Sequence, residues 1–80
     1  MLKVSVISPE ATLFEGEAPS VVAPAFDGEV GILPMHAPMV TTLGAGVLKV
    51  GEGTRFRVEG GFLQVVDDVV RVVTEKAAKL

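Results

Sequence analysis

Short segments that alternate apolar and polar residues, or are simply apolar, run through almost the whole chain, and residues typical of turns separate them. An alternation with period two places successive side chains on opposite faces of a strand. Gly, Pro and Asp interrupt the pattern every few residues, which is typical of a β-sandwich. We therefore predict an all-β fold, a single small β-sandwich or flattened barrel of about ten short strands. The strand segments are residues 2–7, 12–15, 20–23, 39–43, 47–50, 54–59, 62–66 and 69–74.

The ends of the strand segments refine this prediction. Prolines on both sides of residues 20–23 favour an edge strand, and Phe56 and Val58 should face inward. Residues 75–80 have helical character through their alanines and lysines, but they are too few for a stable helix. We expect the sandwich domain at residues 1–75 and a tail at residues 76–80.

Composition limits the classes of function. Eighty residues make one domain, and 49% of them are apolar, which supplies one core. A net charge of −3 argues against a nucleic-acid binder, and the absence of Trp and Tyr argues against a platform for stacking bases. No apolar run approaches the ~20 residues of a membrane helix, so direct membrane insertion is not expected. The high mean hydropathy of +0.52 instead suggests that a partner covers some apolar surface.

The segment from Asp27 to Pro38 stands out from the strand pattern. Asp27-Gly28 is a turn signal, while Pro34 and Pro38 fix their own backbone angles and remove two hydrogen-bond donors. Residues 32–38 should therefore form a stiff, kinked segment with unpaired backbone. Two alternatives remain open: a sandwich corner whose apolar residues turn inward, or an exposed contact loop that presents Ile32, Leu33, Met35 and His36.

Catalytic chemistry is poorly supported by the residues. His36 is the only histidine, cysteine is absent, and no serine is marked as a nucleophile. Asp67-Asp68 is typical of a solvent-exposed hairpin turn and not of a catalytic pair of carboxylates. The acidic residues Glu15, Glu17, Asp27 and Glu29 lack the spacing of a calcium loop. We expect no catalytic residue, no cofactor and no metal. Lys49 faintly suggests a carrier domain, a small β-sandwich that presents a modified lysine at the tip of a hairpin. The turn glycines Gly51 and Gly53 come after Lys49, however, so this lysine should lie within a strand and not at the hairpin tip.

A family resemblance arises from the same segment. The run Gly28-Glu29-Val30-Gly31-Ile32-Leu33-Pro34-Met35-His36-Ala37-Pro38 resembles the signature of the epsilon subunit of F-type ATP synthase. The resemblance extends over nearly the whole chain. It includes Val6-Ile7-Ser8-Pro9-Glu10, Phe14-Glu15-Gly16, Gly46-Val47-Leu48-Lys49-Val50 and Gly60-Gly61-Phe62-Leu63-Gln64-Val65.

The resemblance implies a ten-stranded β-sandwich in the central stalk of the rotor, without an active site of its own. Such a subunit binds the gamma subunit along one side and rests on the polar loops of the c-ring, so that torque from proton flow reaches the catalytic head of F1Fo. It implies a peripheral position at the cytoplasmic face of the bacterial plasma membrane, or the equivalent organelle membrane. The ring and stalk contact would comprise Glu29, Gly31, Ile32, Leu33, Pro34, Met35 and His36.

Three questions stay open at this point. Typical members carry a C-terminal domain of two helices that brakes ATP hydrolysis, whereas this sequence ends at Leu80, so it is a naturally short member or a fragment. Apolar residues at both Val69-Val70 and Val72-Val73 indicate that one outer face is covered, with gamma as the candidate. The alternative function is a stand-alone β-sandwich binding module for a peptide or small ligand, which would require a concave pocket.

Overall fold

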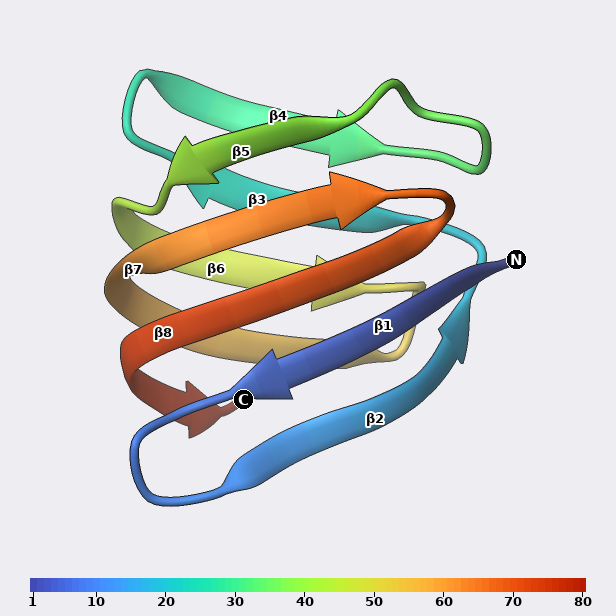
Figure 1. The fold of residues 1–80 in the computed structure, drawn as a ribbon. Coiled ribbons are helices and arrows are strands. Elements are labelled where there is room, and N and C mark those ends of the chain that lie inside the picture. Colours follow the sequence, from blue (N-terminus) through green and yellow to red (C-terminus); the bar gives the residue numbers. More distant parts are fainter.

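The computed structural model describes all 80 residues and contains eight strands and no helix (Figure 1). The all-β prediction is therefore confirmed. The strands are β1 (Leu2–Ile7), β2 (Thr12–Ala18), β3 (Val21–Ala25), β4 (Gly28–Ile32), β5 (Met39–Thr42), β6 (Ala45–Val50), β7 (Thr54–Val66) and β8 (Val69–Lys79).

Two long strands, β7 and β8, connect the two layers of the sandwich. The hydrogen-bonded order is β2-β1-β8-β7-β6-β3-β4, and β5 pairs with β7. Residues 54–59 of β7 pair with β6, whereas residues 62–65 pair with β5. The strand β8 follows β7 along both halves. One layer therefore holds β2, β1 and β5 together with residues 61–66 of β7 and residues 69–74 of β8 (Figure 1). The other layer holds β4, β3 and β6 together with the remaining halves of β7 and β8.

Counting each half of β7 and β8 as a strand of its own layer gives the ten strands expected. The two layers meet at the bend of β7, where Gly60 and Gly61 have φ angles of 73° and 104°. A side chain at Gly61 would overlap the carbonyl oxygen of Val73 and lie 2.7 Å from the Cα of Thr74. On β8, Thr74 is buried, and its hydroxyl donates a hydrogen bond to the carbonyl of Lys76 at 2.8 Å. The bend thus depends on glycine on one strand and on a satisfied buried hydroxyl on the other.

The core lies between the layers and consists of inward side chains at alternate positions. On β7, Phe56 and Val58 are buried while Arg55, Arg57 and Glu59 face solvent, which confirms the predicted alternation. The buried apolar residues are Leu2, Val4, Val6, Ala18, Val21, Ala23, Ile32, Leu43, Leu48, Val50, Phe56, Val58, Leu63, Val65, Val70 and Val72.

The turns follow the predicted chemistry. Gly28, with φ of 129°, closes the hairpin from β3 to β4, and Gly51 turns β6 into β7. Asp67 and Asp68 form the turn from β7 to β8 with φ angles of 50° and 62°. Positive φ at both central residues is the signature of a type I′ turn, whose twist matches the flanking strands. The polar turn residues therefore set the hairpin registers.

The helical character expected for residues 75–80 is wrong, because β8 runs on to Lys79. Lys76, Ala77, Ala78 and Lys79 pair with residues 56–59 of β7, and Ala77 packs against the core. The ladder and this burial outweigh the modest helix preference of alanine and lysine in so short a segment. The boundary expected after residue 75 stays a prediction.

The expectation of an edge strand at residues 20–23 is also wrong, since β3 lies between β4 and β6. The ladder from β3 to β6 comprises only Val21 and Val22. Pro24 lies beyond it, so its missing N–H interrupts no bond to β6. Its carbonyl accepts a hydrogen bond from the Gly44 N–H at 2.8 Å. A proline is thus accommodated in an inner strand where the pairing on one side has already ended.

Candidate docking surfaces

The segment singled out by the sequence divides into a strand and a loop. Residues 28–32 form the regular strand β4, and the stiff, kinked part comprises only Leu33–Pro38, here called the proline loop. Leu33 is 63% exposed and Met35 is 90% exposed, so these apolar side chains point away from the core. The proline loop is therefore the exposed alternative and not an inward corner.

Ile32 is the exception among the predicted contact residues. It is fully buried and pairs with Val21 in the ladder between β4 and β3. The expectation that a loop presents its side chain outside a regular ladder is wrong, because the inward positions of β4 continue to its last residue. Ile32 anchors the base of the proline loop in the core.

The other predicted contact residues are accessible but do not form one cluster. Glu29 and Gly31 are exposed on β4, and no atom lies within 4 Å of a Cβ built on Gly31. Glu29 lies three residues before Ile32, which is about 10 Å along a strand. Pro34 is exposed beside Leu33 and Met35. The structure therefore brings Leu33, Pro34 and Met35 together and leaves Glu29 further back.

His36 is half-buried in the proline loop. Its Nδ1 lies 2.7 Å from the carbonyl oxygen of the adjacent Ala37, a contact that a protonated Nδ1 makes as a donor. This bond within the loop fixes the imidazole ring. This contact is compatible with internal support by His36, and both support and contact with a partner stay predictions.

Asp68 joins the proline loop to the turn between β7 and β8. The Met35 N–H donates a hydrogen bond to Asp68 Oδ1 at 2.6 Å, across 33 residues of sequence. Met35 has a φ of 68°, a left-handed conformation that costs a non-glycine residue about 1 kcal/mol. The hydrogen bond to the Asp68 carboxylate is the contact that opposes this cost. The sequence indicated only a solvated turn here, and no local pattern could have revealed a partner so distant.

The second candidate surface is the outer face of the layer that holds β1, β5 and the paired segments 61–66 and 69–74. Outward positions that neighbour one another through the ladders carry apolar side chains. Among them, Val40 is 69% exposed, Val69 47%, and Phe62 and Val66 40% each. The half-buried Ile7 and Val73 extend the same face. We call these six residues the apolar face: Ile7, Val40, Phe62, Val66, Val69 and Val73.

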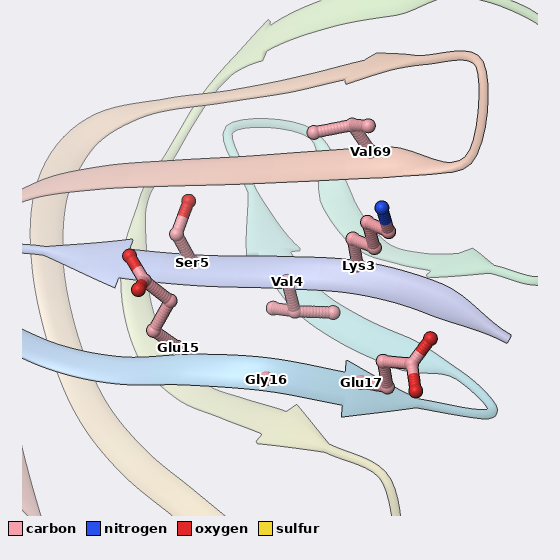
Figure 2. A pocket seen from close by; sticks show the side chains of 7 residues that line it. All are labelled: Lys3, Val4, Ser5, Glu15, Gly16, Glu17 and Val69. Atoms are coloured by element: carbon pink, nitrogen blue, oxygen red, sulfur yellow. The ribbon is translucent and has the colours of Figure 1, made fainter.

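A shallow hollow lies beside the apolar face, over β1 and β2. Figure 2 shows Lys3 and Glu17 on one side of it and Ser5 and Glu15 on the other, with the side-chain-free position of Gly16 between the two glutamates. Val69 stands at its border on β8. Three of its lining residues are charged and two, Val4 and Val69, are hydrophobic, and the hollow is too shallow to enclose a ligand as the pocket of a small-ligand module does.

The structure assembles no catalytic or metal-binding group from the candidates considered. Ser8 donates its hydroxyl to the Ala11 carbonyl in the turn between β1 and β2, which lies at the end of the sandwich opposite to the proline loop between β4 and β5 (Figure 1). No three His, Asp or Glu side chains converge as they would around a metal ion. Lys49 lies within β6 and pairs with Arg55, as expected for a strand residue.

The chain matches the family described as "ATP synthase, Delta/Epsilon chain, beta-sandwich domain" over residues 1–80. The ATP synthase epsilon chain of Leptospira borgpetersenii is 50% identical over 80 residues, covering 96% of this chain and 63% of the relative. That of Desulforamulus reducens is 41% identical, covering 96% of this chain and 61% of the relative. This chain thus spans less than two thirds of the length of these curated relatives.

Solved structures share the fold. A chain of the Euglena gracilis mitochondrial ATP synthase superimposes with a TM-score of 0.88 at 24% identity, covering 98% of this chain and 52% of that one. A chain in a structure of the Tetrahymena thermophila mitochondrial ATP synthase central stalk and c-ring gives a TM-score of 0.80 at 18% identity, covering 96% and 65%. Together with the match over all 80 residues, the conclusion is that this chain belongs to the β-sandwich domain family of ATP synthase delta and epsilon chains.

Proposed function

We propose that this chain is a non-catalytic part of the central stalk of an F-type ATP synthase, where it links the gamma subunit to the c-ring. The single observation that carries the proposal is the arrangement of two exposed apolar surfaces around one end of the sandwich. Most of the apolar face lies on the joined halves of β7 and β8 in one layer, and the proline loop projects beside the turn between these two strands (Figure 1). The curated relatives, named ATP synthase epsilon chains, support it independently.

The apolar face is the proposed site for gamma. Exposed neighbouring side chains of Val40, Phe62 and Val69 form a patch of the kind that marks protein interfaces. The patch also contains polar groups, since the pair Gln64 and Arg71 lies between the apolar pairs Phe62–Val73 and Val66–Val69. Such polar groups can supply the hydrogen bonds that a protein interface usually contains.

The proline loop is the proposed contact with the polar loops of the c-ring. Leu33 and Met35 offer exposed apolar side chains, and the two prolines reduce the conformational entropy that docking would cost. Glu29, Gly31 and Pro34 add accessible surface, with Glu29 available to pair with a basic ring loop, while Ile32 and His36 support the loop from within.

In this role the domain transmits rotation between the ring and gamma and needs neither a cofactor nor a metal of its own. The chain forms no helix and so has none that could span a bilayer. We place it peripherally on the membrane that holds the synthase, at the cytoplasmic face of a bacterial plasma membrane or its organelle equivalent. Residues 1–75 would form the docking domain and residues 76–80 its tail, of which residues 76–79 pair with β7 as the end of β8.

A binding assay with purified gamma subunit and purified c-ring of the same organism tests the proposal. We expect wild type to bind gamma, and Val69→Asp to weaken this binding at least about tenfold by placing a charge within an apolar interface. Ala78→Asp is the matched control, because Ala78 is exposed on the other layer and pairs with Arg57. If folded wild type binds neither partner, or both variants bind gamma equally well, the proposed gamma site is refuted, and a free-standing binding module becomes the better description.

A further inference from the structure

The proline loop has almost no hydrogen bonds that fix it to the domain. Pro34 and Pro38 have no N–H to donate, and none of the eight backbone–backbone bonds outside the ladders involves residues 33–38. The bond between His36 Nδ1 and the Ala37 carbonyl lies within the loop. The bond from the Met35 N–H to Asp68 Oδ1 is the one that joins the loop to another element.

The carboxylate that accepts this bond is itself held in place. The main-chain carbonyl of Asp68 accepts a hydrogen bond from the Lys3 N–H at 2.8 Å, which ties the turn to β1. Asp68 is half-buried, whereas its neighbour Asp67 is exposed. The side chain of Asp68 therefore points to the proline loop from a turn that is anchored on both sides by strands.

The residue type at position 68 is informative. The second central position of a type I′ turn favours glycine, because the φ angle is positive there. Asp68 adopts a φ of 62° instead and is thus strained where a glycine would not be. Hairpin formation alone does not require a side-chain oxygen at this position, but the bond to Met35 does.

The same turn ends the apolar face. Val66 and Val69, the residues on either side of Asp67-Asp68, are both members of that face and pair with each other across the hairpin. A single turn therefore contacts the proline loop through its Asp68 carboxylate and continues directly into the proposed gamma site.

We propose that Asp68 is a positioning residue: its carboxylate holds the proline loop in its docking conformation and fixes it relative to the apolar face. This inference rests on the proposed function, since the position of the loop affects binding only if the loop docks on the c-ring. Removing the oxygen acceptor at position 68 should release the loop and weaken the contact with the ring, while the fold and the apolar face remain intact.

Three variants of the 80-residue chain separate this role from general effects of charge and strain. Asp68→Gly removes the carboxylate and relieves the strain of the turn. Asp67→Gly is the matched control, because it removes the same charge from the same turn without touching a hydrogen bond to the loop. Asp68→Asn keeps an oxygen acceptor at the position of Oδ1 and should rescue the loop.

Three measurements are made on each variant: amide hydrogen exchange of Met35 in the free chain, the Kd for purified gamma, and the Kd of the chain–gamma complex for purified c-ring. In Asp68→Gly we expect Met35 exchange to rise and c-ring affinity to fall, each by about tenfold, the loss expected for one hydrogen bond to a charged group. Affinity for gamma should stay within about twofold. Asp67→Gly should resemble wild type, and Asp68→Asn should lie close to it.

The outcomes distinguish this inference from the proposed function. Unchanged exchange at Met35 in Asp68→Gly would show that the carboxylate does not hold the loop. Faster exchange with a c-ring affinity equal to that of Asp67→Gly would show that the loop position does not matter for docking. Either result overturns the inference. If wild type binds neither gamma nor the ring, the proposed function fails together with the docking role, and exchange at Met35 alone decides whether Asp68 holds the loop.

Discussion

The two outer faces of the sandwich differ in chemistry, although the same two strands contribute to both. In the layer that holds β6, the outward residues of β7 and β8 include Arg55, Arg57 and Lys76. Beyond the bend, in the layer that holds β5 and β1, the pair Gln64 and Arg71 is polar, and the outward pairs on either side of it are apolar. A strand that is only solvated needs no apolar residues on its outer side. The change within single strands therefore indicates that one layer is built to be covered and the other to face water.

The largest effect is expected at the bend that separates these two environments. Gly61→Ala would place a methyl group against the backbone of β8 at a φ of 104°, so we expect a loss above about 4 kcal/mol in the free energy of unfolding, close to the total stability of a small domain. Gly53→Ala is the control, since its Cβ would have no atom within 4 Å, and it should change stability by less than about 1 kcal/mol. Urea denaturation measures both. If the two variants were equally stable, the division into layers would not depend on the bend.

A pair of phenylalanines on β7 tests which face is core. Phe56 is 2% exposed and Phe62 is 40% exposed. Phe56→Ala should cost about 3–5 kcal/mol in the isolated chain, whereas Phe62→Ala should cost about 1 kcal/mol or less. Denaturation of the free chain gives these values. Equal losses would mean that the apolar face is already buried within the domain, and the contrast between the faces would disappear.

The smallest effect concerns the charged face. Lys49 and Arg55 occupy directly paired positions on β6 and β7, both with exposed side chains. Like charges in this arrangement repel, so Lys49→Glu should stabilise the chain by roughly 0.2–1 kcal/mol, with a smaller gain at high salt. Lys79→Glu, at the end of β8, serves as a control for the change in net charge. A destabilised Lys49→Glu chain would show that the Lys49 side chain has a structural role that this account omits.

Local patterns in the sequence predicted much of the fold. The turn residues Asp27-Gly28 and Asp67-Asp68 and the alternation from Arg55 to Glu59 depend only on neighbouring residues, and the structure confirms them. The path of the last residues could not be predicted in this way, because pairing with residues 56–59 decides it. Pro24 likewise indicated an edge, since the sequence does not show where the ladder to β6 ends.

The candidate site shows the same division. The prolines that interrupt the strand pattern indicated a loop but left open whether its apolar residues turn inward. The structure shows that Leu33 and Met35 are exposed, and the burial of Ile32 depends on how far β4 continues. The bond between Met35 and Asp68 joins residues 33 positions apart, so only the folded chain reveals it. Local chemistry thus identified the loop, and tertiary structure was needed to identify what holds it.

The passage of β7 and β8 through both layers also has a mechanical consequence. In a sandwich of separate sheets, the layers can slide over each other by rearranging side chains alone. Here any such sliding would have to bend the backbones of both β7 and β8 and break the hydrogen bonds of the ladder between them, which continues on both sides of the bend. A block of 28 × 25 × 20 Å built in this way should turn as one stiff body and lose little of an applied twist to internal shear.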